Sequence, residues 1–395
     1  MECKDIRVGI KGVKGKILHH SFKKIPIKTL LLSFQDKRRV LSTREGFKEV
    51  DAVGNNSGPP PLWDMVHKKW DEYLDKVVSD VGYKMEEIAL LSTGVDMDNM
   101  GEAKESFERF EVLCFATAGV KSNAVRLGED ITRAYERDGK FFSVGTINII
   151  LLTSASLTNG ALARSIITIT EAKTAVLQDL DIRSSYAPLE NQATGTGTDN
   201  IIVVSGNAPK IKYVGGHSKM GELIAKATAM AVKEAILKQN RLSPSRPLEK
   251  RLKERGITMD DLIRTGLEMY IPHSQIGDRE RIELLLRKEL TKTLKDINVA
   301  SLILAGLRLE EEGQKGRVPG LNKEEYKKDP VHLIADEILG IQIATYIAGS
   351  RALFEFERFD KRKPGILKEL PPILDDVIGG LISGALVKVC SNYDS

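Results

Sequence analysis

Five short blocks rich in small, hydroxyl and amide residues alternate with strand-like apolar runs between Cys114 and Gly221. They read FATAGVKSNAVRLGED, GTINIILLTSASL, TEAKTAVLQDL, ATGTGTDNIIVVSG and GGHSKMGEL. A hydrophobic core is built mainly from Leu, Ile and Val, and a buried polar group that lacks a hydrogen bond costs about 1–3 kcal/mol. We therefore expect these blocks to line a ligand site between buried strands.

The apolar runs around these blocks predict a mixed fold for the first part of the chain. Strands buried on both faces, or nearly so, are expected at 112–118, 145–153 and 200–205. Apolar residues at helical spacing predict helices over about 159–180 and 218–238. NNSGPPP at 55–61 predicts a loop. This part is therefore expected to be α+β or α/β.

The character of the chain changes at QNRLSPSRPLEK, residues 239–250, which has little to bury and reads as a linker. No convincing strand follows it, so the second part is expected to be all-helical. We predict an N-terminal domain over 1–240 and a C-terminal domain over 248–395, joined by that linker. Two domains also agree with a length of 395 residues.

The composition is ordinary for a soluble globular protein, with 42% hydrophobic and 29% charged residues. A net charge of +4 predicts no nucleic-acid partner. The longest apolar stretch near the C-terminus, 377–387, is shorter than the ~20 residues that span a bilayer. Because no export signal is read and the three cysteines lie far apart, we expect a cytoplasmic protein without disulfides. The sequence leaves a homo-oligomer open.

Candidate catalytic groups follow the polar blocks of the first part. Gly195 and Gly197 let backbone amides approach a ligand closely, as in anion or oxyanion sites. Asp199 follows that turn, and Glu171 lies off the apolar stripe of its helix. His217 precedes a helix, whose dipole favours a neutral imidazole that can act as a base or donor.

Amide side chains and one lysine complete the candidates of this part. Asn123 and Asn148 are amide donors of the kind that polarise a carbonyl, and Lys173 falls on an apolar helical stripe. Each residue also has a structural interpretation: a capping His, a solvated Glu, an Asn that ties a loop, or a Lys that extends along apolar surface. Their clustering, rather than any one of them, favours a site.

The blocks GTINII, TEAKTAVLQDL, RSSYAPLENQATGTGTD and GGHSKMGELI resemble the adenosylcobinamide amidohydrolase family of archaeal corrinoid salvage. RRVLSTREG and LLSTGVDMDNM fit the same family, and the resemblance covers about residues 6–238. It implies a corrinoid substrate, whose amide between aminopropanol and a corrin propionate is hydrolysed. The products would be adenosylcobyric acid and 1-amino-2-propanol. The alternative is a corrinoid carrier or sensor that does not cleave.

The resemblance leaves the mechanism open. One hypothesis has Glu171 or Asp199 activate water, the 194–198 amides and Asn148 hold the oxyanion, and His217 protonate the amine. A covalent route through Thr196 or Ser122 is the rival. The predicted catalytic and substrate-binding residues of this domain are Glu171, Asp199, His217, Asn148, Asn123, Thr196, Gly197 and Lys173.

Carboxylates stand out in the second part of the chain. Asp329-Pro330 reads as the start of a helix that runs to about Ala348, and the helix is almost entirely apolar except for Asp336 and Glu337. A second acidic pair opens the last helix, which begins near Pro371. Carboxylate oxygens suit Mg²⁺. The predicted metal ligands are Asp336, Glu337, Asp360, Asp375 and Asp376.

Basic residues near these carboxylates complete the predicted site. Arg358 and Lys363 are expected to bind a phosphate. The structural alternative is a salt-bridge cluster in a helical module that is not catalytic.

DEILGIQIA, RFDKRKPGIL and LDDVIGGLISG resemble the phosphatidylglycerophosphatase A family, over about residues 248–390. LKERGITMDDL and INVASLILAGLRLEEEGQKGRVPG resemble its soluble helical members, one of which acts as an α-ribazole-phosphate phosphatase in archaeal corrinoid synthesis. The resemblance implies a phosphorylated nucleoside as substrate, with a lipid phosphate as the weaker alternative. We therefore expect a bifunctional hydrolase of adenosylcobalamin synthesis with Mg²⁺ in its second domain.

Overall fold

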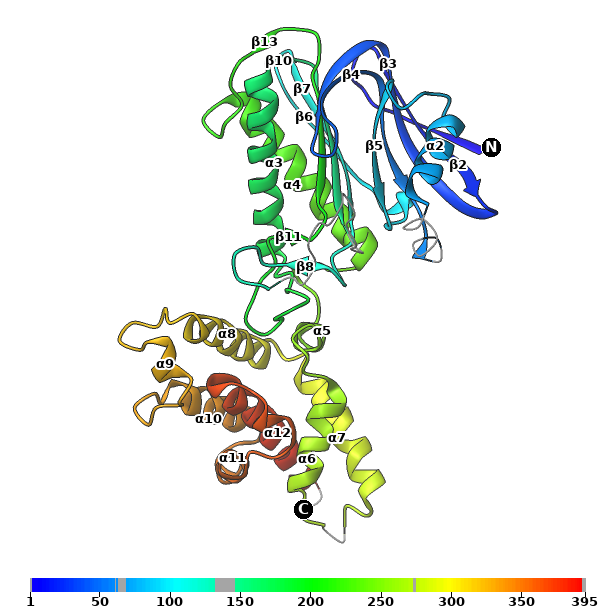
Figure 1. The fold of residues 1–395 in the computed structure, drawn as a ribbon. Helices are drawn as coiled ribbons and strands as arrows, with labels where there is room; N and C mark the ends of the chain where they lie inside the picture. Colours follow the sequence, from blue (N-terminus) through cyan, green and yellow to red (C-terminus); the bar gives the residue numbers. More distant parts are fainter. Residues whose placement is uncertain (1, 61, 63–68, 132–145, 273–274, 393–395) are drawn as a thin grey trace. The chain divides into compact units, whose positions relative to one another are not determined.

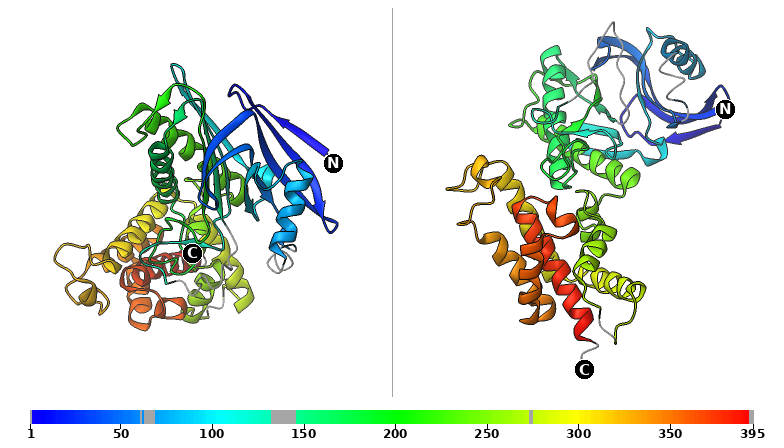
Figure 2. Two further views of the ribbon diagram at one scale, coloured as in Figure 1. Left: turned by 45° about the horizontal axis from the view of Figure 1, so that its top comes forward. Right: turned by 60° about the horizontal axis from the view of Figure 1, so that its bottom comes forward.

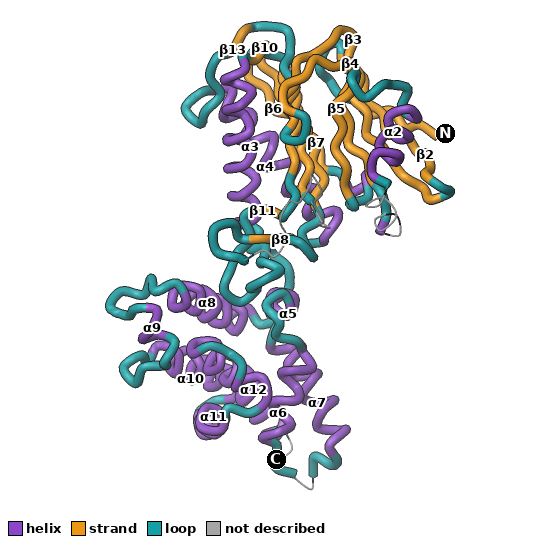
Figure 3. The backbone as a smooth tube through the Cα atoms, in the orientation of Figure 1, coloured by secondary structure: helices purple, strands orange, loops and turns teal. Residues whose placement is uncertain are grey.

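The protein divides into two compact units in the computed structural model (Figure 1). The first unit comprises Met1–Ala187 and Gln192–Pro244, and the second comprises Pro188–Asn191 and Ser245–Ser395. The structure describes residues 2–60, 62, 69–131, 146–272 and 275–392. The predicted fold class is confirmed, because the first unit is a mixed sheet with helices and the second is helical (Figure 3).

The first unit contains a curled mixed sheet of nine strands in the order β1-β2-β3-β12-β9-β7-β6, with β4 paired to β3 and β5 paired to β4. Its strands are β1 Glu2–Ile6, β2 Val13–Phe22, β3 Ile25–Ser42, β4 Gly46–Ser57, β5 Ile88–Thr93, β6 Gly101–Phe107, β7 Phe110–Ala118, β9 Ile147–Thr153 and β12 Asn200–Val204. β9 and β12 are parallel, as are β4 and β5, whereas β7 runs antiparallel to β9. The three strands expected at 112–118, 145–153 and 200–205 are therefore confirmed and are neighbours.

Helices cover this sheet from outside its curl (Figure 1). α4, Lys219–Asn240, packs mainly on β6 and β7, and α3, Asn159–Asp179, packs beside α4 and on β12, through a core of small and branched apolar residues. α2, Trp70–Asp80, covers β2 to β5. Each of the two longer helices begins at a hydroxyl cap, Thr158 and Ser218 respectively, which accepts from the amide three residues ahead. Both predicted helices are therefore confirmed.

β4 runs further than the sequence indicates. Its last three residues, Asn55 to Ser57, pair with β5, although the sequence predicts that a loop begins at Asn55. Polar residues disfavour a strand, but here the two asparagine side chains are buried and find partners on both faces of the sheet. The carboxyl end of β4 therefore carries polar side chains into the interior.

The second unit is a bundle built around α12, Pro372–Ser391 (Figure 2). This helix is apolar nearly all round and is buried along most of its length, as expected of a central helix. The surrounding helices are α5 Leu248–Lys253, α6 Met259–Met269, α7 Arg279–Thr293, α8 Ile297–Gln314, α9 Lys323–Tyr326, α10 Ala335–Ala348 and α11 Arg351–Arg362. Among the described residues, no helix has the length and apolarity needed to span a membrane.

α10 begins later than predicted. The sequence places its start at Asp329-Pro330, but the helix begins at Ala335. Asp329 has a φ of 49°, in the left-handed region, and so lacks the extended backbone of a helix cap. A turn over residues 330–334 therefore separates Asp329 from the helix.

Candidate functional sites

Parts of several polar blocks of the first unit meet at one end of its sheet, where β4, β5 and β7 end and β9 and β12 begin. At this end lie Asn55, Thr117, Asn148 and the loop that holds Asp199. Four of these strand ends thus place polar side chains beside one another, and β5 adds the backbone carbonyl of Ser92. The strand directions explain why these residues, which are far apart in the sequence, lie together.

Asn148 is the centre of a buried amide network. Its Nδ2 donates to Oδ1 of Asn55 and to the backbone carbonyl of Ser92, both at 2.9 Å. Nδ2 of Asn55 in turn donates to the hydroxyl of Thr117 at 3.0 Å. Because both amide hydrogens of Asn148 are used inside the protein, it has no donor left for an oxyanion. Its role in this structure is to join β4, β5 and β9.

Lys173 and Asp199 form a partly buried ion pair at the same end of the sheet. Lys173 comes from α3 and is 6% exposed. Oδ1 of Asp199 also accepts from the backbone amides of Thr196 and Ile147, each at 3.1 Å, and from the hydroxyl of Thr196. Asp199 therefore organises the loop and holds the one lysine of the α3 stripe in place.

Gly195 leaves space for this ion pair. A Cβ on residue 195 would lie 2.5 Å from Oδ2 of Asp199 and 2.8 Å from Nζ of Lys173. The backbone amides of residues 194–198 were predicted to hold an oxyanion. In the structure, the amide of Thr196 donates to Asp199, and the amide of Gly197 donates to the carbonyl of Asn123 at 3.3 Å. The glycine thus lets a charged pair, rather than a ligand, approach the backbone.

The structure brings together six of the eight residues predicted for this domain: Asn123, Asn148, Lys173, Thr196, Gly197 and Asp199. Glu171 is exposed and lies two residues from Lys173, so it occupies another face of α3. His217 is exposed on the loop before α4, which follows the opposite end of β12. Of the two carboxylates proposed to activate water, only Asp199 lies in this group, and His217, the proposed acid for the amine, lies away from it.

The second unit contains a group of three carboxylates, which we call the acid cluster: Asp336, Glu337 and Asp376. One ligand oxygen from each lies within 4.8 Å of the others. Oε2 of Glu337 is buried and has no hydrogen-bond partner among the described residues. Such a set has the hard oxygen donors that a divalent cation requires.

Two glycines bring the acid cluster together. Asp336 lies one helical turn before Gly340 on α10, and Asp376 lies one turn before Gly380 on α12. A Cβ on Gly380 would be 2.3 Å from the backbone oxygen of Gly340. The two backbones are therefore in contact at the crossing, and the aspartates one turn away meet.

Burial makes the acid cluster reluctant to ionise. Burial, together with the neighbouring Glu337, raises the pKa of Asp336 to about 8. Burial and the nearby carboxyls of Asp375 and Asp360 raise the pKa of Asp376 to about 8, against the attraction of Lys363. Both aspartates therefore favour the neutral, protonated form as long as no further positive charge lies beside them.

Among the described residues, Lys363 is the one lysine that contacts the carboxylates of α10 or α12. Its Nζ lies 2.5 Å from Asp375, 2.8 Å from Asp360 and 3.5 Å from Asp376. Its burial lowers its pKa, but these carboxylates outweigh burial and hold the pKa above the usual value. Burial still raises the pKa of Asp375 to about 6, because desolvation outweighs the attraction of Lys363. Asp360 and Asp375 thus hold Lys363 beside the acid cluster.

Arg358 is not part of this group. Its Nη1 pairs with Glu355 at 2.6 Å, and its Nη2 lies 3.4 Å from the carbonyl of Met269. It lines a separate cavity of about 250 Å³ with Phe354 and Tyr270. On α11, Arg358 and Asp360 are two residues apart and so face different directions. The prediction that Arg358 meets the same ligand as Lys363 is therefore corrected.

The sequence analysis did not predict that two residues, Asn55 and Asp329, lie at these sites. Asn55 was expected in a loop, yet it accepts from Asn148. Asp329 was expected to cap α10, yet it lines a cavity next to Asp375. For Asn55 the doubled asparagine was a usable signal, whereas the position of Asp329 depends on a turn that the sequence does not show.

Comparison with known proteins finds similarities in both units. The family model described as adenosylcobinamide amidohydrolase matches residues 16–244, and the model described as phosphatidylglycerophosphatase A matches residues 286–391. An uncharacterised protein of Methanocaldococcus jannaschii is 54% identical over 226 residues, which are 54% of this chain and 88% of that protein. A second uncharacterised protein of the same organism is 37% identical over 128 residues, which are 31% of this chain and 96% of that protein.

A solved structure is similar to part of the chain. The low temperature requirement C protein from Listeria monocytogenes is 26% identical, with a TM-score of 0.33. The match covers 37% of this chain and 94% of that one.

Proposed function

Since the chain belongs to the adenosylcobinamide amidohydrolase family over residues 16–244, we propose that its N-terminal unit hydrolyses the aminopropanol amide of adenosylcobinamide. The products are adenosylcobyric acid and 1-amino-2-propanol. The observation that supports this proposal is the partly buried group of Lys173, Asp199 and Thr196 at the polar end of the sheet.

Asp199 is the proposed base of this reaction. Amide hydrolysis needs a group that accepts a proton from the nucleophile and returns it to the leaving amine. The hydroxyl of Thr196 already donates to Asp199. Asp199 can therefore take the proton from Thr196 as its oxygen attacks, or from a water that replaces that hydroxyl. Lys173 holds the carboxylate in position through the ion pair.

Release of 1-amino-2-propanol, identified by mass, tests this assignment. Asp199→Asn should lower turnover at least a hundredfold, because the amide cannot accept the proton. Glu171→Gln should leave turnover within twofold of the native protein, because Glu171 lies on another face of α3. The reverse pattern would contradict the assignment, and binding of adenosylcobinamide without release would show a carrier.

Two further variants separate the covalent route from the water route. If Thr196 is the nucleophile, Thr196→Ser retains activity and Thr196→Val abolishes it. If water is the nucleophile, Thr196→Val retains a measurable rate.

We propose that the C-terminal unit is a Mg²⁺-dependent phosphatase that acts on α-ribazole 5'-phosphate. The acid cluster fits the ion, since it offers three carboxylates and a buried Glu337 oxygen without a partner among the described residues. Asp336, Glu337 and Asp376 would hold Mg²⁺, which offsets phosphate charge and positions water when bound. Lys363 would donate to a phosphate oxygen, oriented by Asp360 and Asp375.

Phosphate release from α-ribazole 5'-phosphate tests this proposal. We expect EDTA to abolish release and added Mg²⁺ to restore it. Lys363→Gln should lower kcat/KM at least tenfold, because it removes a charged donor. The matched control Lys361→Gln changes an exposed lysine of the same helix that pairs with Glu357, and it should have no effect. An unchanged rate of phosphate release in EDTA would contradict the assignment of the acid cluster as a Mg²⁺ site.

A further inference from the structure

Three consecutive glutamates, Glu310 to Glu312, lie near the end of α8. Glu312 is at the surface and pairs with Arg317. Glu310 and Glu311 are only 1% and 6% exposed. A carboxylate is rarely buried unless other groups of the protein pair with it. The two buried glutamates are therefore expected to hold parts of the second unit together.

Glu310 reaches the start of α12. Its Oε2 accepts from the backbone amide of Ile373 at 3.2 Å, and its Oε1 accepts from Nε2 of Gln314 at 2.9 Å. Burial and the neighbouring charge of Glu310 raise the pKa of the Tyr326 hydroxyl, so this side chain lies at the same place. A Cβ on Gly313 would be 2.4 Å from the Tyr326 ring, which shows that the ring packs directly on α8. Glu310 thus meets α12 where water has almost no access.

The first turn of α12 depends on this contact. The helix begins after Pro371 and has no side-chain cap of its own among the described residues. Pro372 has no amide hydrogen, and the amides of residues 374–375 donate to the carbonyl of Pro371. The amide of Ile373 instead finds its acceptor on another helix, in Glu310. A carboxylate at this end of a helix also faces the positive end of the helix dipole.

This contact lies one turn away from the acid cluster. Asp376 follows Ile373 by three residues and meets Asp336 of α10 in that cluster. Mg²⁺ requires oxygen ligands at ~2.0–2.1 Å in nearly ideal geometry, so a small shift of α12 is enough to spoil the site. Groups that orient metal ligands change the metal affinity by about 10–100-fold when they are removed.

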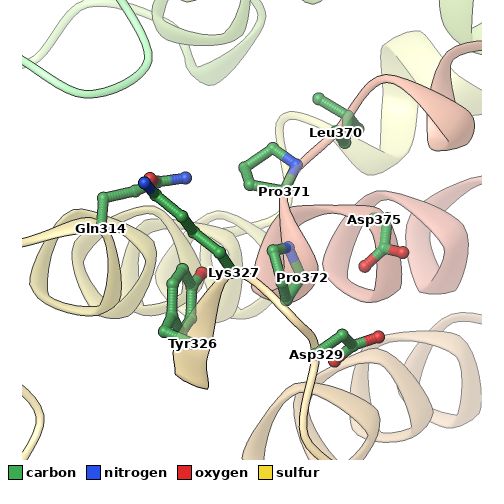
Figure 4. Close-up of a pocket in the computed structure, with 8 residues that line it drawn as sticks. All are labelled: Gln314, Tyr326, Lys327, Asp329, Leu370, Pro371, Pro372 and Asp375. Carbon is green, nitrogen blue, oxygen red and sulfur yellow. The ribbon is translucent and has the colours of Figure 1, made fainter. Parts of the chain in front are cut away.

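Glu310 does not line the space beside the acid cluster. Gln314, Tyr326 and the two prolines at the start of α12 line a cavity of about 340 Å³ that also reaches Asp375 (Figure 4). The described residues that line it do not include Glu310. Glu310 therefore affects the site through α12 and not through contact with a substrate.

We propose that Glu310 is a positioning residue of the metal site, which caps α12 from α8 and so holds Asp376 where it meets Asp336. This inference rests on the proposed function, because that function requires the Mg²⁺.

Calorimetric titration with Mg²⁺ tests this inference. We expect Glu310→Ala to weaken Mg²⁺ binding at least tenfold. Glu310→Gln keeps an acceptor oxygen for the amide of Ile373, so its Mg²⁺ affinity should stay within threefold of the native value. Recovery of the affinity in the Gln variant would show that the cap, and not the charge, is what the site needs.

Glu311 provides a matched control. Its carboxylate pairs with Arg255 at 3.1 Å and with Arg308 at 2.7 Å. Glu311→Ala therefore also removes a buried carboxylate of α8 and should lower the melting temperature. Its Mg²⁺ affinity should nevertheless stay within twofold of the native value.

Phosphate release gives a readout that a general loss of folding would not produce. In Glu310→Ala, raising the Mg²⁺ concentration at least tenfold should restore release, because more ion compensates for a weaker site. A rate that stays low in saturating Mg²⁺ would contradict a role in holding the metal ligands.

Amide hydrogen exchange separates this inference from the proposed reaction. The amide of Ile373 should exchange at least tenfold faster in Glu310→Ala than in the native protein or in Glu310→Gln, without any metal or substrate. If the native protein binds Mg²⁺ but releases no phosphate, the reaction is wrong, and the titrations still decide the role of Glu310. If the native protein binds no Mg²⁺, the positioning role is wrong even where the exchange result holds.

Three further results would overturn the inference. Unchanged Mg²⁺ affinity in Glu310→Ala would show that the cap does not influence the metal site. Equal losses in Glu310→Ala and Glu310→Gln would show that Glu310 acts through its charge. An equal loss in Glu311→Ala would show that removing either buried carboxylate of α8 has the same effect.

Discussion

At the scale of single residues, His20 shows why an arrangement of side chains must be judged with its burial. Its Nδ1 lies 2.9 Å from Asp80, and its Nε2 lies 2.8 Å from the hydroxyl of Thr29. The order Thr, His, Asp is that of a hydrolase triad. Thr29 is 0% exposed, however, and also accepts from Asn56 at 2.8 Å. No substrate reaches it, so the group joins α2 to the sheet.

Asp80 should make this joint sensitive to acid. Burial raises its pKa, but the hydrogen bonds from Lys76 and His20 outweigh burial and hold the pKa below its usual value. A lowered folded-state pKa adds stability above the unfolded-state pKa of ~3.9, and that stability is lost as the pH falls through the folded-state value. Asp80→Asn should therefore lower the free energy of unfolding by about 1–3 kcal/mol at pH 7.

Urea unfolding at pH 7 and at pH 3 measures this effect. The difference between native protein and variant should shrink at the lower pH. A difference of equal size at both values would contradict a charged role for Asp80.

The sequence predicted the types of residue at each site better than their partners. Lys173 was conspicuous on an apolar stripe, and Asp199 followed a glycine-rich turn, but 26 residues separate them. Their pairing exists only because α3 packs beside the start of β12. Glu171 and His217 had equally suggestive local contexts, and the fold turns both toward solvent. Local context cannot distinguish these cases, since tertiary packing decides which polar groups are buried.

At the scale of helices and strands, the crossing of α10 and α12 determines where the acid cluster forms. Both helices were predicted from their apolar composition, as was the carboxylate pair on each. The start of α10 was placed too early, because Asp329-Pro330 has the composition of a cap and the backbone of a turn. The glycines that allow the crossing were in the sequence, but which pair would touch depends on the packing angle.

Adding one methyl group at the crossing should separate the two helices. Gly380→Ala places a Cβ 2.3 Å from the carbonyl oxygen of Gly340, so we expect a loss of about 1–3 kcal/mol in stability. Mg²⁺ affinity should fall at least tenfold, because the aspartates one turn away move apart. Thermal unfolding and calorimetric titration with Mg²⁺ measure the two effects.

Gly379→Ala is the matched control. Its Cβ would lie 3.5 Å from the nearest atom, in Leu367, which is ordinary contact. Helix propensity favours this change by up to about 1 kcal/mol, so stability and affinity should be kept. Equal losses in both variants would show that the crossing has no special role.

At the scale of the whole molecule, each unit has its own hydrophobic core. The sheet of the first unit is packed on both faces, and the bundle of the second is packed around α12. Two functions that need different chemistry can therefore be served by separately packed units. This organisation was readable from the sequence, because the loss of strand patterns after residue 250 reports a change of architecture rather than a detail of packing.

Mg²⁺ should stabilise only one of the two units. At a hundredfold excess over its Kd, a ligand adds about 2.7 kcal/mol, which raises the melting temperature of a domain of this size by about 5–10 °C. Differential scanning calorimetry should show one transition that moves with Mg²⁺ and one that does not. In Asp376→Asn neither transition should move, and a shift retained in that variant would place the ion elsewhere.

The contact between Gly340 and Gly380 also has a consequence for ion size. Oxygen ligands lie at ~2.0–2.1 Å from Mg²⁺ and at ~2.3–2.6 Å from Ca²⁺. The larger ion therefore needs carboxylate oxygens that are further apart. Because the backbones of α10 and α12 are in contact, the two helices cannot come closer together. The spacing of the carboxylate oxygens would then be adjusted by rotation of the side chains alone. The absence of side chains at Gly340 and Gly380 would then contribute to discrimination between Mg²⁺ and Ca²⁺, two cations of equal charge.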